Sequence, residues 1–305
     1  KLKIFLSALI IASVAFVKPG DKSPNITSGE VTDHIKYLAS DELAGRFPGT
    51  DGDKLTVEYI VNEFEEYGIT PAGEDGYLQP FDYISEIKLG KDNSLSIGNG
   101  ELIKGSGEEF TTLYLSANGT AQGNIVFVGY GINAPELNYN DYAGIDLKGK
   151  IALMLMYSPG YNNPHDNPFS KYERLRIKCA AAKEQGAAGI IVVKGPESGE
   201  DELVKLRMSG PGETMDIPVM NVKRSYVEYI FTNSKKMSLS EVQKNIDSLR
   251  TPMSFEFGGG MAQLKADLVR IKALTNNVIG KIEGKDPVLK NEYIIIGAHM
   301  DHLGD

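Results

Sequence analysis

Hydrophobic positions in the first part of the chain recur with the period of amphipathic helices. Residues 27–30 have the pattern of a capping box, and apolar residues follow at helical spacing as far as Ala39. A second periodic segment covers residues 55–67 and stops at Gly68, a residue type that favours the end of a helix. The pattern predicts two helices joined by a loop over residues 40–49.

The middle of the chain changes to short β-type runs with frequent Gly and Asn between them. In order, the pattern predicts strands at residues 94–97, 124–128 and 150–156, a helix at residues 171–185, and a strand at residues 189–193. The succession of strand, helix and strand implies a small α/β module.

The last part of the chain returns to β-type alternation over residues 261–283. It then contains an uninterrupted apolar run over residues 292–298. Such a run is typical of a parallel strand that is buried on both faces. We therefore expect a buried strand at residues 292–298.

Composition limits the size of the folded part and the kind of partner. The chain has 305 residues, 41% of them hydrophobic, which is enough for one large or two moderate domains. Its formal net charge is −9, and Lys and Arg are scattered along the chain. Because nucleic-acid binding depends on a basic surface, nucleic acid is not expected as a partner.

The N-terminal residues have the pattern of a secretory signal peptide. Two lysines within residues 1–3 precede an apolar run over residues 4–17 that is too short to span a bilayer comfortably. Small residues at 13–15 suit signal peptidase, so we expect cleavage near Ala15 and a periplasmic or secreted protein with no membrane attachment afterwards. The alternative is a buried N-terminal strand or helix. No Cys follows the run, which disfavours a lipid anchor.

Several familiar motifs are imitated or missing. Residues 129–134 imitate a dinucleotide fingerprint, but Pro135 and polar residues follow where a helix is needed. Residues 144–150 have the spacing of a phosphate loop, but a predicted strand follows them, so we interpret both segments as turns. The HExxH, paired CxxC and GxSxG signatures are absent. Cys179 lies in an alanine-rich, helix-like stretch, where a small buried thiol is favoured over a nucleophile.

The strongest candidate for chemistry follows the apolar run at residues 292–298. His299, Asp301 and His302 come directly after the expected strand, and catalytic groups in open α/β sheets collect at the carboxyl ends of strands. A metal-bound imidazole needs its second nitrogen held, commonly by a carboxylate, and Asp301 is close enough in sequence to do this. The alternative is that His299 only caps the strand while Asp301 faces water.

At this point the sequence resembles the di-zinc aminopeptidases related to aminopeptidase Y, glutamate carboxypeptidase and transferrin receptor. The resemblance extends over nearly the whole chain after the signal. In the flanking parts of the chain it rests on YLASDELAGRFPG at 37–49 and on GAHMDHLG at 297–304, with residues 277–280 and 284–287 before the latter. In the middle of the chain it rests on VFVGYG at 126–131, Asp141-Tyr142, residues 148–150 and residues 178–189. The segments at 126–131 and 178–189 resemble the protease-associated domain that many members carry as an insert.

The resemblance implies an α/β fold with a mixed, mainly parallel sheet of the zinc-exopeptidase type and flanking helices. After a signal peptide at residues 1–15, residues 28–85 and 266–305 belong to the peptidase domain in this reading. An inserted protease-associated domain, β-rich and of α/β type, occupies residues 90–262.

The resemblance also implies roles for individual residues. His299 matches the first zinc ligand, Asp301 matches the acidic catalytic-site residue that supports this imidazole, and His302 matches a position that is not a ligand. Members hold two zinc ions about 3.5 to 4 Å apart that share an activated water. The bridging Asp, the general base Glu and the other ligands come later in family sequences. We therefore expect this chain to stop before them and to be inactive by itself.

The implied activity is hydrolysis of N-terminal residues from peptide substrates. A catalytically inactive receptor-like or peptide-binding protein of the same architecture is the main alternative, because the transferrin receptor branch is not catalytic. Glutaminyl cyclases share the sheet, but in general they lack the insert. A carboxypeptidase or dipeptidase is the nearest alternative among enzymes.

Overall fold

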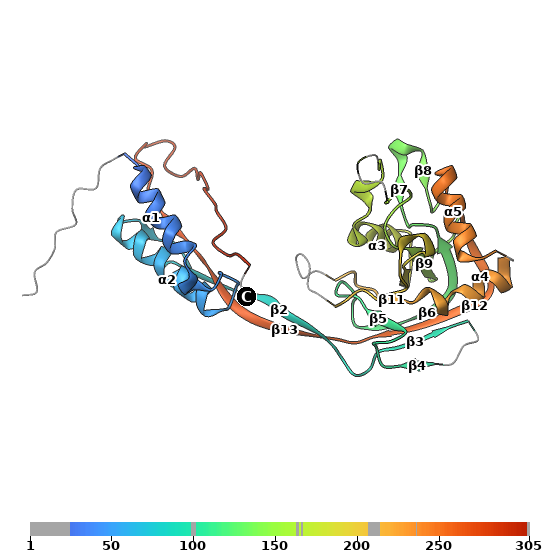
Figure 1. The fold of residues 1–305 in the computed structure, drawn as a ribbon. Helices are drawn as coiled ribbons and strands as arrows, with labels where there is room; N and C mark the ends of the chain where they lie inside the picture. Colours follow the sequence, from blue (N-terminus) through green and yellow to red (C-terminus); the bar gives the residue numbers. More distant parts are fainter. Residues whose placement is uncertain are drawn as a thin grey trace, which may run out of the picture. The chain divides into compact units, whose positions relative to one another are not determined.

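The computed structural model describes residues 25–98, 102–162, 165, 167–206, 214–235 and 237–303. The expected signal peptide, residues 1–15, lies outside these residues. The chain divides into two compact units (Figure 1). We call Lys1–Tyr83 with Ala273–Asp305 the terminal unit, and Ile84–Lys272 the central unit.

Two helices make up most of the ordered structure at the start of the terminal unit. Helix α1 spans Ser28–Leu38, and a capping box between Thr27 and Glu30 fixes its first turn. A short 3₁₀ helix, η1 (Asp41–Leu43), and then helix α2 (Asp51–Glu66) follow. These elements confirm the two helices that the hydrophobic period predicted.

Helices α1 and α2 lie side by side, as Figure 1 shows. The ring of Tyr59 on α2 lies 4.3 Å from that of Tyr37 on α1, centroid to centroid. The Tyr59 hydroxyl also lies 2.5 Å from Nδ1 of His34. The facing side chains of the two helices are thus joined by aromatic and polar contacts.

The strands of the terminal unit are few. Strand β1 (Thr70–Pro71) pairs antiparallel with β14 (Gly280–Lys281). Strands β2 (Leu78–Leu89) and β13 (Leu268–Val278) form a second two-stranded sheet, along which the chain passes between the two units.

The buried strand expected at residues 292–298 is not formed. Tyr293, Ile294, Ile295 and Ile296 are between 80% and 94% exposed. A strand requires a neighbour to bond its backbone groups, and a strand of this composition also requires cover on both faces. Among the described residues nothing pairs with this run, so the expectation from its hydrophobicity was wrong for this structure.

The central unit contains a mixed sheet of eight strands, in the spatial order β4-β3-β12-β6-β9-β10-β11-β5. The pairs β6–β9, β9–β10 and β10–β11 are parallel, and the pairs toward both edges are antiparallel. The strands are β3 Ser94–Ile97, β4 Ile103–Lys104, β5 Phe110–Thr112, β6 Gly119–Val128, β9 Ile151–Leu155, β10 Gly189–Val193, β11 Val219–Val222 and β12 Ser254–Ala266.

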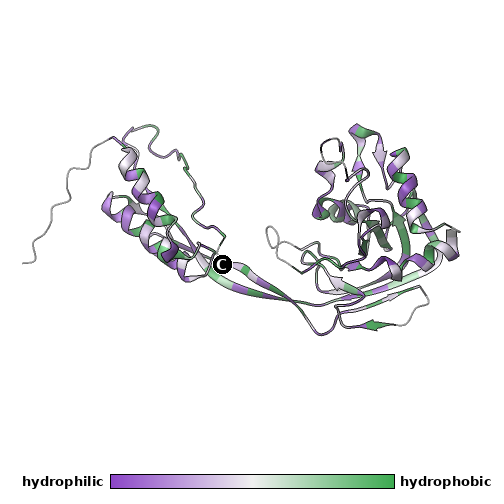
Figure 2. Cartoon of the chain, viewed as in Figure 1, coloured by the Kyte–Doolittle hydropathy of each residue, from purple (hydrophilic) through white to green (hydrophobic). Residues whose placement is uncertain are grey.

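Helices cover both faces of this sheet. Helix α3 (Leu175–Glu184) packs its Cys179 and Ala182 in the same apolar cluster as Ala152 and Met154 of β9. Helices α4 (Glu228–Lys235) and α5 (Leu239–Leu249) contribute to the cluster of the other face, which contains the alternate residues of β9. The middle strands are the hydrophobic ones in Figure 2. This mixed α/β arrangement confirms the predicted module of strand, helix and strand.

The two motif-like segments are turns, as expected. Strand β6 ends at Val128, and a turn leads into the small pair β7 (Asn133–Ala134) and β8 (Tyr139–Asn140), with no α-helix after it. Residues 144–150 lead into β9. Neither segment begins a helix at which a phosphate would bind. Within the described residues, no helix is both long and apolar enough to cross a bilayer.

Candidate functional site

The segment after the exposed apolar run holds His299 in a defined ring orientation. Its Nδ1 atom lies 2.9 Å from the backbone carbonyl oxygen of Asp301. A carbonyl oxygen only accepts hydrogen bonds, so Nδ1 must donate and therefore carries the hydrogen. In the neutral ring this leaves the lone pair on Nε2, the form in which imidazole binds a metal. The His299 side chain is 78% exposed, so the ring is accessible.

Asp301 holds the imidazole with its main chain rather than with its side chain. The nearest carboxylate oxygen, Oδ1, lies 3.8 Å from Nδ1 of His299, which is beyond hydrogen-bond distance. The sequence predicted that the carboxylate would take this place. The backbone carbonyl of the same residue fixes the same tautomer, so the ring has the orientation expected of a ligand while the Asp301 carboxylate remains uncommitted.

A loop from the other end of the chain contacts this segment through Arg46. The Nε atom of Arg46 donates to the carbonyl of Met300 at 2.7 Å, and its guanidinium also donates to the carbonyl of Leu38. The amide of His302 donates to the carbonyl of Arg46 at 3.1 Å. The sequence singled out residues 37–49 as a shared motif, but no local pattern predicts that they touch residues 300–302.

This contact borders a hollow of about 660 Å³ within the terminal unit. Loop residues 38–41 and 44–46 line it together with His302 and Leu303. The Oγ atom of Ser40 is buried there and has no hydrogen-bond partner. The hollow therefore includes residues that follow His299 in the chain, but His299 itself does not line it.

Helix α2 supports the loop by a close approach. An added Cβ at Gly52 would lie 1.9 Å from the carbonyl oxygen of Leu43 and 2.2 Å from that of Gly45. The buried carboxylate of Asp53 accepts from the amide of Gly49 at 2.8 Å and from the hydroxyl of Thr275 at 2.6 Å. Sequence reasoning missed Asp53, because its acceptor role joins residues far apart in the chain.

The described residues do not form a complete zinc site by themselves. Among them, no three His, Cys, Asp or Glu side chains come together in a way that would hold a metal ion. His299 has the tautomer and exposure of a ligand, but a zinc site requires about three protein ligands or more. The described part of the chain therefore does not hold a zinc ion by itself.

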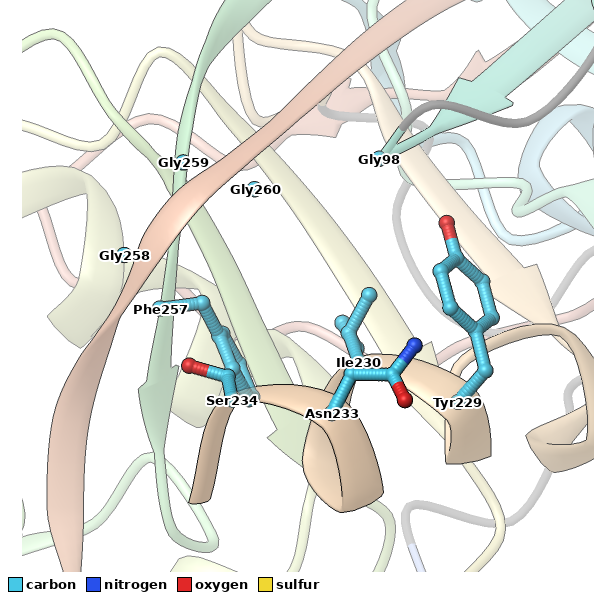
Figure 3. A pocket seen from close by; sticks show the side chains of 9 residues that line it. All are labelled: Gly98, Tyr229, Ile230, Asn233, Ser234, Phe257, Gly258, Gly259 and Gly260. Atoms are coloured by element: carbon cyan, nitrogen blue, oxygen red, sulfur yellow. The ribbon is translucent and has the colours of Figure 1, made fainter. Parts of the chain in front are cut away.

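A second hollow, of about 190 Å³, lies in the central unit and is shown in Figure 3. Tyr229, Asn233 and Ser234 on α4 line one side, and Gly258–Gly260 line the other, where β12 bulges out of register with β6. The Tyr229 hydroxyl donates to the carbonyl of Ile97 at 2.5 Å. The described lining contains no carboxylate, imidazole or thiol, so it lacks the usual metal ligands; the Tyr229 hydroxyl is its one acid–base group and already donates to Ile97.

The polar groups in the core of the central unit have their partners inside the protein. The Asp141 carboxylate accepts from the amides of Tyr130 and Ile132 and from the hydroxyl of Tyr139, at 2.9 to 3.1 Å. Burial raises the pKa of Asp141 to about 7, although these donors act in the opposite direction. The satisfied contacts indicate a structural role for Asp141.

Lys178 and Cys179 on α3 are also fully enclosed. The Lys178 ammonium donates to the carbonyls of Leu155 and Tyr157 at 2.7 and 2.6 Å, and burial lowers its pKa to about 7. Burial raises the pKa of the Cys179 thiol to about 12. A protonated, inaccessible thiol is not a nucleophile, which confirms the prediction for Cys179.

Comparison with known proteins assigns part of the central unit to a family. Residues 101–230 match the model of the PA domain family. That match supports the expected protease-associated insert, which was inferred from short segments at 126–131 and 178–189. No curated protein matches the sequence significantly.

The solved structures that the chain resembles include several peptidases. They include an aminopeptidase from Aneurinibacillus sp. strain AM-1 (22% identity, TM-score 0.43), the zinc aminopeptidase BSAP from Bacillus subtilis (18%, 0.32) and a peptidase M28 precursor from Shewanella amazonensis SB2B (18%, 0.34). The matches cover 91%, 87% and 84% of this chain and 53%, 49% and 54% of those chains. The chain thus spans about half the length of these structures. With identities under 25% and TM-scores under 0.5, they carry no functional assignment by themselves.

Proposed function

We propose that this chain is part of a zinc-dependent aminopeptidase of the di-zinc family, which removes N-terminal residues from peptides. The observation that supports this most directly is the state of His299. Its Nδ1 hydrogen is bonded to the Asp301 carbonyl, so Nε2 keeps a lone pair that can bind a metal ion. The side chain is exposed and lies within the motif GAHMDHLG. A PA domain within the same chain agrees with the expected organisation of such a peptidase.

In this proposal the roles of the three C-terminal polar residues differ. His299 provides one metal ligand through Nε2, and Asp301 positions the ring. His302 is not a ligand in this proposal, and its backbone amide joins the segment to the loop at Arg46. Zinc bound at the completed site would act as a Lewis acid and activate water. The groups that complete the site are not assigned to any residue of this chain.

The proposal extends to the organisation of the chain and its surroundings. We propose that the insert at residues 90–262, which lies within the central unit, influences access of peptide substrates rather than their chemistry. Among the residues of the insert that the structure describes, no set of metal ligands comes together, which supports this division of roles. The signal-like residues 1–15 support an exported, periplasmic or secreted location.

Substitution of His299 tests the proposal in the active protein that contains this chain. We expect His299→Ala to abolish release of a chromogenic amine from an aminoacyl substrate and to lower the bound zinc, measured by mass spectrometry. His302→Ala is the matched control, since it removes a neighbouring imidazole that the proposal does not use, and it should keep both properties.

Full activity in His299→Ala would contradict the proposed metal site. Binding of peptides without zinc and without turnover in the unchanged protein would instead favour the receptor-like alternative. Release of C-terminal residues, or of intact dipeptides, would assign a carboxypeptidase or dipeptidase of the same family.

A further inference from the structure

We infer that Arg46 is the positioning residue for His299. The two residues are far apart in the chain and do not touch. Arg46 acts through the backbone on both sides of Asp301, whose carbonyl oxygen fixes the His299 ring. The inference rests on the proposed function, in which the orientation of that ring decides whether Nε2 can serve as a ligand.

The hydrogen bonds of Arg46 fix two points of the segment. Its Nε holds the carbonyl of Met300, and its own carbonyl holds the amide of His302. Met300 and His302 are the residues immediately before and after Asp301. Fixing both neighbours restricts the peptide planes between them, and therefore the direction of the carbonyl that accepts from His299.

The chemistry of the side chain suits this task. A guanidinium is planar and donates in several fixed directions, so Arg46 reaches the carbonyl of Met300 with Nε and that of Leu38 with another nitrogen. Leu38 is the last residue of α1, so the segment is tied to the end of a helix. A lysine at position 46 would keep the charge but has a single donor centre.

No strand among the described residues holds the backbone at His299 in place of the hydrogen bonds to Arg46. The residues immediately before His299 form no strand, and Tyr293 to Ile296 are almost fully exposed. Hydrogen bonds to Arg46 connect Met300 and His302 to the rest of the terminal unit.

Nuclear magnetic resonance of the full chain with ¹⁵N-labelled histidine tests the inference without activity or metal. In the unchanged chain we expect Nδ1 of His299 to have the shift of a protonated nitrogen and Nε2 that of an unprotonated one. Arg46→Ala removes the side-chain hydrogen bonds to Met300 and Leu38 but keeps the backbone carbonyl that accepts from His302. Because the segment then has a single hydrogen bond to a loop that is no longer tied to α1, the ring should exchange between both tautomers and the amide of His302 should exchange with solvent about tenfold faster. In Arg46→Lys we expect an intermediate result.

Lys54→Ala is the matched control, since it removes a positive charge from an exposed side chain of the same unit. It should leave the His299 shifts and the His302 exchange rate unchanged. Unchanged shifts and exchange in Arg46→Ala would overturn the inference. Equally fast exchange throughout α2 would also overturn it, because Arg46 would then support the whole unit. Complete rescue by Arg46→Lys would remove the role of the guanidinium geometry.

These readouts separate the inference from the proposed function. If His299→Ala retains activity, the proposed metal site fails while the effect of Arg46 on the ring tautomer still stands. If Arg46→Ala leaves the tautomer unchanged, the positioning role fails while His299 remains a candidate ligand.

Discussion

Replacement of Asp141 is the sharpest test of how the PA-containing unit is held together. The residue is fully buried and its carboxylate accepts from three donors: two backbone amides through Oδ2 and the Tyr139 hydroxyl through Oδ1. Asp141→Ala removes all three acceptor contacts at once. Tyr130 and Ile132 lie in the turn after β6 and Tyr139 begins β8, and all three are buried, so water does not replace a lost partner without rearrangement.

The expected loss of stability follows from the number of buried hydrogen-bond donors that lose their acceptor. Each of the three buried donors left without a partner costs about 1 to 2 kcal/mol, so Asp141→Ala should lower the free energy of unfolding of the central unit by about 3 to 6 kcal/mol. Asp141→Asn keeps one oxygen that can accept from both amides, and its NH₂ group can donate to the Tyr139 hydroxyl. Its cost should be about 1 to 2 kcal/mol.

The single cysteine of the chain provides the assay. Cys179 is buried in the central unit, so it reacts with a thiol reagent only when that unit opens. The extent of labelling as a function of urea concentration therefore reports unfolding of this unit. With a slope of roughly 2 kcal/mol per molar urea, the midpoint should fall by about 2 M for Asp141→Ala. A loss smaller than about 1 kcal/mol for Asp141→Ala, or equal losses for Ala and Asn, would refute the reasoning.

The remaining predictions concern the pH dependence of the central unit, measured by Cys179 labelling, and a glycine of the terminal unit, measured by hydrogen exchange. Burial raises the folded-state pKa of Asp141 from an ordinary value of 3.8 to about 7, so the folded unit binds a proton that the unfolded chain has released in this range. Its contribution to stability should fall as the pH rises from about 4 to about 7, and Asp141→Asn should remove this slope. Gly52→Ala should destabilise the terminal unit by at least about 2 kcal/mol, because its Cβ would meet two backbone carbonyls. The loss of stability is measured by hydrogen exchange of the α2 amides. Gly68→Ala is the control: an alanine at its φ of +68° costs about 1 kcal/mol of backbone strain, but the added Cβ meets no other atom.

Elements specified by neighbouring residues could be predicted from the sequence. The capping box at Thr27 and Glu30 begins α1, and the apolar runs of β9 and β10 are buried at every position. In these cases the pattern and its partner lie within a few residues, or the run is short and framed by turns. The hydrophobic period was therefore sufficient.

The contacts that build the candidate site could not be predicted in this way. Arg46 and Met300 are 254 positions apart, and Asp53 and Thr275 are 222 apart. No local period specifies which loop meets which segment over such distances. The sequence indicated His299 and Asp301 by residue type and position, whereas the use of the Asp301 carbonyl in place of its carboxylate depends on the backbone of residues 299–302.

The exposed run before His299 explains why the loop contact matters. Large apolar side chains at 293–296 lose the free energy of burial while they face solvent, so the local sequence does not stabilise the extended conformation seen here. If residues 292–298 formed a paired strand, the strand would fix the backbone direction at His299, which follows it. Without that pairing, the direction of the ring depends on the hydrogen bonds among Arg46, Met300 and His302 and on the Asp301 carbonyl between them. The orientation of the candidate ligand is thus determined by a loop that joins α1 to α2, not by the segment that carries it.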